Sequence, residues 1–340
     1  MTTTSQGPPP VASGIRLALA LALGLAAAAC RAPAPDADPD APRGGTERDV
    51  VRTADPIERG LGEAAFPRVQ EIAPGVYTYE ALRSAGAERF TTVSMFVVTS
   101  EGVLVADGQG SPGETRRLLD AIAAVTDRPV THVVVCSDHG DHTGGNSAFP
   151  PDVELLAHPT SAATLRAAAA GEDGASVVVP TRTVAERDVV SLGGREIHVL
   201  FLGRAHTGGD LVVYLPAEKV LFMSEAYLNR VFPAMRSAYP TEWVSMIERA
   251  QAMDVDVYVP GHGFVETPRI LEEELETYRR ALVQVIAEAR RLHDAGLGVD
   301  EAVDSARFGD LDGWSLRDGQ GPTAIRRVFG ELRGELARNE

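Results

Sequence analysis

The sequence has little cysteine, a single lysine and no excess of positive charge. Its two cysteines, Cys30 and Cys136, allow at most one disulfide, which excludes a disulfide-stabilised scaffold. Its formal net charge of −16 argues against nucleic acid as a partner, because binding to phosphate backbones needs clustered Lys and Arg. The 340 residues are 44% hydrophobic and 24% charged, which is enough for a packed core and excludes a disordered or fibrous protein.

Long apolar runs are also scarce, and the first one lies near the N-terminus. Residues 17–29 are small or apolar, and they follow Arg16 with no acidic residue before it. Thirteen residues span roughly 20 Å as a helix, short of the roughly 30 Å hydrocarbon core of a membrane. We therefore expect a signal peptide over residues 1–29.

The end of this run, Leu25-Ala-Ala-Ala-Ala-Cys30, resembles a bacterial lipobox. This resemblance implies an exported lipoprotein of the periplasm or cell envelope, which contacts the membrane only through a lipid on Cys30. Ordinary cleaved export and a retained anchor are the alternatives.

Composition divides the rest of the chain into three parts. Residues 30–65 are rich in Pro, Ala and Asp and lack aromatics, which predicts a disordered tether. Residues 66–295 alternate strand-like and helix-like segments, which predicts one α/β domain. Residues 296–340 predict a helical extension with a helix over 321–336, which either packs on the domain or dimerises.

Short β-branched or aromatic runs between Gly, Pro and Asp predict the strands. They lie at 76–79, 92–99, 103–106, 131–136, 153–157, 189–192, 196–201, 210–215, 220–223 and 255–259. Helical spacing of apolar residues predicts helices over 113–125, after Thr241 as N-cap, and from Thr267-Pro268 to near Gly296.

Four of the eight histidines follow predicted strands and have Gly or acidic neighbours. His139, Asp141 and His142 leave a buried strand together, and a kink at Gly140 would bring their donor atoms to one depth. The tetrapeptide His-Thr-Gly-Gly at 142–145 recurs at 206–209, so His206 is expected in the same cleft as His142.

The fourth, His262, lies between Gly261 and Gly263, which allow close approach of the backbone. Imidazole and carboxylate donors without cysteine favour Zn²⁺ or a similar divalent metal such as Fe²⁺ or Mn²⁺. The remaining histidines lack such neighbours and are interpreted as structural: His132, His158, His198 and His293.

The order of these residues resembles the motif pattern of the metallo-β-lactamase superfamily of hydrolases. That pattern begins with H-x-H-x-D-H and continues with a His before a Gly-rich turn, a metal-bridging acid and a final His. The resemblance covers roughly residues 70–265. It implies an α/β fold of the four-layered α+β type, the αββα sandwich, with metals at the edge between two sheets. It places His139, Asp141 and His142 in the first motif, His206 in the second and His262 in the last.

Asp107 corresponds to an acid that supports the metal loop from behind. Two positions depart from the family pattern: Ser137 stands where the first His is usual, and Glu225 stands where the bridging Asp is usual. In the family, that first His binds one metal with the residues matching His139 and His206. The residues matching Asp141, His142 and His262 bind the other. We therefore expect one or two metals, with Ser137 as a weak ligand and Glu225 bridging or covering the altered position.

The resemblance implies hydrolysis of a small ester, lactone, thioester or amide by metal-activated water, with Asp141 orienting that water or accepting its proton. Tyr227 and Arg230 are expected to shape the substrate pocket, and Arg230 and Arg236 are candidates for holding an anionic group. Two alternatives stay open: a catalytically impaired binding or scaffold protein, and a member that handles sulfur compounds or redox chemistry.

Overall fold

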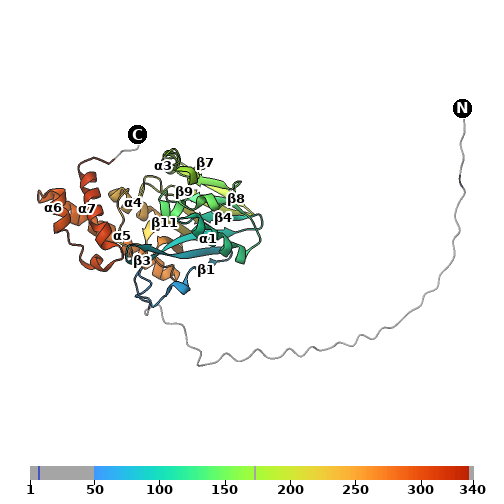
Figure 1. Ribbon diagram of the computed structural model, residues 1–340, viewed down its shortest axis with the longest axis horizontal. Coiled ribbons are helices and arrows are strands. Elements are labelled where there is room, and N and C mark those ends of the chain that lie inside the picture. The colour runs from blue at the N-terminus through green and yellow to red at the C-terminus, as the bar shows by residue number, and fades with distance from the viewer. Residues whose placement is uncertain (1–6, 8–49, 172–173, 337–340) are drawn as a thin grey trace, which may run out of the picture. The chain divides into compact units, whose positions relative to one another are not determined.

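A single curled sheet of twelve strands organises the protein in the computed structural model, which describes Gly7, residues 50–171 and residues 174–336 (Figure 1). The strands are β1 (Arg68–Ala73), β2 (Val76–Ala85), β3 (Glu88–Val98), β4 (Val103–Ala106), β5 (Val130–Val135), β6 (Glu154–Ala157), β7 (Arg182–Thr183), β8 (Arg187–Leu192), β9 (Arg195–Leu200), β10 (Val212–Leu215), β11 (Val220–Leu228) and β12 (Val257–His262). The helices are α1 (Pro112–Val125), α2 (Gly140–Thr143), α3 (Pro159–Ala169), α4 (Pro240–Gln251), α5 (Pro268–Asp294), α6 (Val299–Ser305) and α7 (Arg317–Leu332).

The sheet order is β7-β6-β5-β4-β3-β12-β11-β10-β9-β8, with β2 paired to β3 and β1 to β2. The strands β3 and β12 share a single register pair, Thr92 with His262. The sheet bends at this short ladder into two halves, β1–β7 and β8–β12, whose inner faces share one hydrophobic core.

Side-chain alternation along the strands separates the core layers. On β4, Leu104 and Ala106 join the core between the sheet halves, whereas Val103 and Val105 join the core beneath α1 and α3. Helices α4 and α5 contact the other half of the sheet along β11 and β12. The order of layers is helix, sheet, sheet, helix, which confirms the predicted αββα sandwich.

The C-terminal extension packs on its own domain. Helix α7 contacts α5 and α6 and places Ile325, Val328 and Phe329 in the main core (Figure 1). Helix α4 begins two residues earlier than predicted, with Tyr239 rather than Thr241 at its N-cap. The hydroxyl of Thr241 instead donates to Glu331 on α7, 2.7 Å away.

The predicted tether is wrong for its last residues. Ala54 is fully buried, Arg52 pairs with Glu274 on α5 at 2.7 Å, and the Arg59 guanidinium lies 4.0 Å from the centre of the Phe264 ring. Composition reports only the apolar content of the segment itself. It does not show that α5 and the β12–α5 loop form a surface on which this segment packs. Cys30 and the predicted signal peptide, Gly7 apart, lie outside the described residues. None of the helices in the described ranges is long and apolar enough to span a bilayer.

Candidate metal centre

All six predicted metal ligands meet at one edge of the sandwich. Their ligand atoms form two groups: Asp141, His142, Glu225 and His262; and His139, His206 and Glu225. Within each group the ligand atoms lie within 4.8 Å of one another, and Glu225 belongs to both.

The chain positions the first three donors with one helical turn after β5. His139 is the N-cap of α2, and Asp141 and His142 belong to that turn. Gly140 has no heavy atom within 4 Å of the position of an added Cβ, and its φ is not in the left-handed region. The predicted glycine kink is therefore wrong: the turn itself, closed by Gly144 N donating to the Gly140 carbonyl, arranges the donors.

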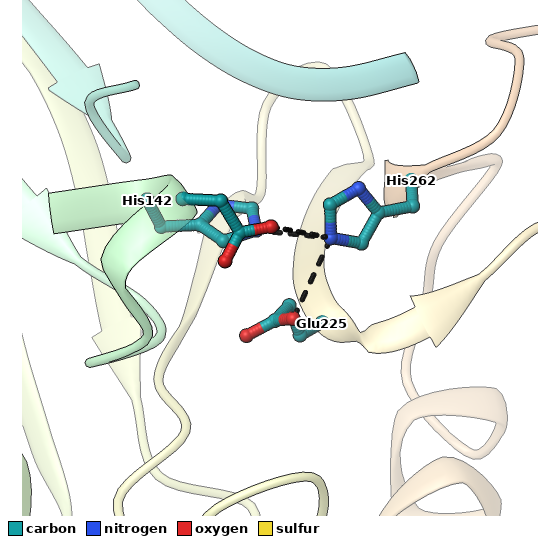
Figure 2. Close-up of side chains that lie close together, drawn as sticks. His142, Glu225 and His262 are labelled. Carbon is teal, nitrogen blue, oxygen red and sulfur yellow. Dashed lines mark hydrogen bonds and ion pairs between the residues drawn. The ribbon is translucent and has the colours of Figure 1, made fainter. Parts of the chain in front are cut away.

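The rings of His142 and His262 meet edge-on at the centre, with centroids 5.1 Å apart and planes at 69° (Figure 2). His142 Nδ1 lies 3.0 Å from Asp107 Oδ2, and His262 Nδ1 lies 2.8 Å from the carbonyl oxygen of Thr91. Both partners are acceptors, so in the neutral rings each Nδ1 carries the proton and each Nε2 presents a lone pair. The two Nε2 atoms are only 3.3 Å apart, a contact that either a shared proton or a metal ion bound by both nitrogens would satisfy.

Asp141 adds a negative oxygen to this pair. Its Oδ2 lies 3.3 Å from His262 Nε2 and 4.0 Å from His142 Nε2. Zinc bonds of about 2.0–2.1 Å at tetrahedral angles separate donor atoms by about 3.3–3.4 Å. The spacing and chemistry of these donors therefore fit a divalent metal.

The second group has one donor fewer. His139 Nδ1 and His206 Nε2 are 2.9 Å apart, and the two Glu225 oxygens lie 3.0 Å from the first and 3.1 Å from the second. Glu225 Oε1 is also 3.5 Å from His262 Nε2, so this carboxylate lies between the groups. Ser137 is fully buried and donates its hydroxyl hydrogen to Glu225 Oε2.

The buried carboxylates make the centre attractive to positive charge. Burial by itself lowers the pKa of His262, but the adjacent Asp141 and Glu225 carboxylates raise it to about 10. Burial likewise disfavours charge on His139, yet Glu225 raises its pKa to about 9. Metal binding at these rings would release protons, which makes metal affinity dependent on pH.

Asp107 supports the centre from behind, in the position that the family resemblance implied. Besides His142, its carboxylate accepts from the backbone N–H of Cys136 at 2.7 Å and from the hydroxyl of Ser224. Asp107 and Ser224 both have positive φ, of 61° and 47°. The network holds their strained backbone and places a carboxylate oxygen beside His142 Nδ1.

The expected pocket residues Tyr227 and Arg230 are not in the cleft. Tyr227 is fully buried, and its hydroxyl donates to the Leu271 carbonyl at 3.2 Å. Arg230 donates from Nη2 to Glu274 Oε1 at 2.8 Å. Strand β11 runs to Leu228 instead of ending at Met223 and is buried throughout, so Tyr227 lies in the core beside Tyr278 of α5.

A cleft of about 490 Å³ opens at the metal centre. Besides the candidate ligands, its walls are formed by Arg83, Ala85, Phe90, Leu228, Val231, Ala234, Arg236, Leu316, Gly319, Gln320 and Thr323. Sequence reasoning singled out Arg236 but missed Arg83, whose Nε lies 3.6 Å from Asp141 Oδ2. It also missed the four residues from the beginning of α7, since no local pattern shows which surface a C-terminal helix meets.

The comparisons with known proteins agree with this geometry. A sequence profile described as the Metallo-beta-lactamase superfamily matches residues 87–262, just over half of the chain. The chain is 29% identical over 211 residues to the 2,4-dinitroanisole O-demethylase subunit alpha of Nocardioides sp. (strain JS1661), covering 61% of this chain and 62% of that protein. It is 24% identical over 256 residues to the linear primary-alkylsulfatase of Pseudomonas sp. (strain ATCC 19151), covering 61% of this chain and 48% of that protein.

The chain thus spans less than two thirds of the length of these two relatives. Among solved structures, a metallo-beta-lactamase from Pontibacter korlensis superposes with a TM-score of 0.56 at 24% identity, covering 63% of this chain and 98% of that one. At that identity the likeness shows the fold. The extent of the profile match and the shared fold show that this chain belongs to the metallo-beta-lactamase superfamily, whose members are generally hydrolytic enzymes.

Proposed function

We propose that this protein is a metal-dependent hydrolase of a small ester, lactone, thioester or amide. The observation that carries the proposal is the pair of Nε2 atoms of His142 and His262, which converge at 3.3 Å beside a carboxylate oxygen of Asp141. His142, His262 and Asp141 would hold one divalent ion, for which Zn²⁺ is the first candidate and Fe²⁺ or Mn²⁺ the alternatives.

A second ion would take His139 and His206, with Glu225 between the two positions. This position has fewer donors than the first, because Ser137 supplies a hydroxyl that is directed at Glu225 instead of an imidazole. We therefore propose that it binds metal more weakly. When bound, a divalent cation supplies an activated water as nucleophile and polarises the scissile carbonyl.

The protein's own groups would orient the reactants and move the proton. Asp141 directs Oδ2 toward the two rings, which leaves Oδ1 as the oxygen that we assign to accept the proton of the attacking water. Its side chain is 19% exposed, compared with 5% for Glu225, so the proton can pass from Asp141 to solvent. Burial disfavours its charge, but the hydrogen bond from His262 and the charge of His142 hold the pKa of Asp141 below its usual range. The Arg83 guanidinium lies 3.6 Å from the same carboxylate.

The test combines metal content with a substrate panel. The relatives are named as a metallo-beta-lactamase, an alkylsulfatase and an O-demethylase subunit, so the panel contains a β-lactam, an alkyl sulfate and 2,4-dinitroanisole beside esters, lactones and thioesters. Purified protein should contain one to two equivalents of metal and hydrolyse a member of the ester, lactone, thioester or amide classes.

His142→Ala should lose at least one equivalent of metal and at least 10²-fold in kcat/KM, because it removes a ligand that has no substitute nearby. His132→Ala is the matched control, since His132 lies outside both groups and pairs with Glu154. Bound metal without hydrolysis of any substrate would support a binding or scaffold role, and turnover confined to sulfur or redox substrates would support the other alternative.

We also propose that the chain is exported and anchored through a lipid on Cys30, as its N-terminal sequence indicates. Mass spectrometry of the mature protein should find an N-terminal lipidated cysteine, and Cys30→Ala should move the protein from the membrane to the soluble fraction. An N-terminus upstream of residue 30 in the mature protein would contradict the lipoprotein assignment.

A further inference from the structure

The C-terminal helix α7 forms one wall of the cleft at the metal centre. Leu316, Gly319, Gln320 and Thr323 line it beside the β11–α4 loop, which contributes Val231, Ala234 and Arg236 and pairs through Val231 with Ser315. Most of these side chains are apolar or small, so the middle of the cleft suits a hydrocarbon segment.

A second hollow, of about 340 Å³, continues along α7 from this wall. The two hollows share Arg236 and Thr323. The second is lined further by Arg326, Arg327, Gly330, Glu335 and Leu336. Three arginines around one carboxylate make this a basic surface on a protein with a formal net charge of −16.

Two of these arginines have no carboxylate partner within the described part of the chain. Arg236 is exposed and has no ion pair or hydrogen bond there. Arg327 donates to the backbone carbonyls of Ser237 and Ala238, the latter from Nε and the former from Nη2 at 3.1 Å. Arg327 thereby holds the loop that carries Arg236 against α7, while Arg326 pairs with the exposed Asp300 at 2.6 Å.

We propose that the hollow between Arg236 and α7 is a distal subsite for an anionic group of the substrate. This inference rests on the proposed function and narrows its substrate class to elongated molecules. The scissile carbonyl lies at the metal centre, an apolar segment crosses the cleft past Val231 and Leu316, and a carboxylate or similar anion meets the guanidinium of Arg236. Arginine is suited to this contact, because its planar fork binds carboxylates in a bidentate manner.

The kinetic test uses p-nitrophenyl monoesters of dicarboxylic acids of increasing chain length. Each is compared with the neutral compound in which the free carboxylate of the same monoester is methylated. The metal-loaded enzyme should prefer the anionic member by at least about tenfold in kcat/KM once the chain reaches the hollow, and added salt should reduce this preference. Arg236→Ala should lower the preference at least about tenfold through KM, whereas Arg236→Lys retains part of it.

Arg290→Ala is the matched control, since Arg290 is an exposed arginine of α5 outside both hollows. An equal rate for charged and neutral esters at every length, or an unchanged preference in Arg236→Ala, would overturn the subsite.

A binding experiment keeps the subsite testable if no ester is hydrolysed. Calorimetry on the metal-loaded protein should show octanedioate binding at least about tenfold more tightly than 1,8-octanediol, with the difference reduced in Arg236→Ala but not in Arg290→Ala. Tighter binding of octanedioate by a protein that hydrolyses none of the tested substrates would contradict the proposed function and support the subsite. Equal binding of the two compounds would overturn the subsite, whatever the activity.

Discussion

The hydroxyl of Ser137 donates to the Oε2 atom of Glu225, the carboxylate that both groups of candidate ligands share. Ser137 follows β5 and is fully buried, and this hydrogen bond places its hydroxyl at the metal centre. The family resemblance implies His at position 137 and Asp at position 225, and Glu is one methylene longer than Asp, so we propose that the two departures compensate each other in size.

Ser137→His is expected to bind metal more tightly at the His139 and His206 position, because it adds a neutral imidazole donor. The added ring crowds Glu225, and overpacking a buried site costs about 1–3 kcal/mol. The double variant Ser137→His with Glu225→Asp removes one methylene and should therefore show the larger gain, at least about tenfold in affinity. Chelator competition with metal analysis measures it, with Glu225→Asp alone as the control. An affinity no higher than wild type in the double variant would show that position 137 does not face a metal.

Gly263→Ala should destabilise the protein and weaken metal binding. Gly263 follows His262 with φ of +84°, and an added Cβ would lie 2.0 Å from the carbonyl oxygen of Asn229. The substitution would combine an unfavourable positive φ with a steric clash against backbone atoms. We therefore expect a loss of about 3 kcal/mol or more in unfolding free energy. Gly140→Ala is the matched control beside another ligand, since an added Cβ there meets nothing within 4 Å. Chemical denaturation with and without chelator checks both, and similar losses in the two variants would contradict this explanation.

Phe329→Ala should destabilise the whole domain by about 3–5 kcal/mol, because it leaves a cavity in the main core. Phe329 on α7 is 1% exposed and belongs to the core that also contains residues of the sheet and of α5. Val283→Ala on α5 is the control, since Val283 is 44% exposed and a change there is worth about 0.5 kcal/mol or less. One cooperative transition with a lowered midpoint is the expected result. A separate early transition for the extension would show that α7 is not part of the domain's cooperative unit.

Glu80→Gln should remove part of the pH dependence of stability. Burial raises the pKa of Glu80 from 4.5 to about 7, although Arg68, 2.9 Å away, favours the charged form. The folded state therefore retains a proton on Glu80 that the unfolded state loses. The contribution of this proton to the free energy of unfolding is complete below pH 4.5 and is lost as pH rises through about 7. At about 1.4 kcal/mol per pKa unit, the effect is of the order of a few kcal/mol.

The measurement compares denaturant midpoints of wild type and Glu80→Gln at several pH values between 4.5 and 8. The difference between the two proteins isolates Glu80 from the titration of the metal ligands, which both proteins share. Glu71→Gln, at an exposed position of the neighbouring strand β1, is the control. Parallel pH profiles for wild type and Glu80→Gln would contradict the prediction.

Local sequence patterns predicted most of the strands and the principal helices, because alternating burial and helical spacing act over a few residues. Ten of the predicted strands overlap strands of the structure, and the Thr267-Pro268 start of α5 is confirmed. The patterns missed β1, β7, α2, α3 and α6, which are short or lack a regular series of large apolar residues.

By itself, the sequence determined which side chains assemble at the candidate metal centre. Glu225 and His262 lie in β11 and β12, and His139, Asp141, His142 and His206 lie in the segments that follow β5 and β9, so the sandwich brings them to one edge. The histidines and Asp141 stood out by their neighbours in the sequence, whereas Glu225 was predicted through the family resemblance. Only the tertiary structure decided what surrounds them. The pairing of Arg230 with Glu274, the docking of residues 52–59 and the cleft wall formed by α7 join residues far apart in the chain. Such contacts depend on how complete helices and strands pack against one another. Their stabilising energy comes from surfaces that form only when the chain folds.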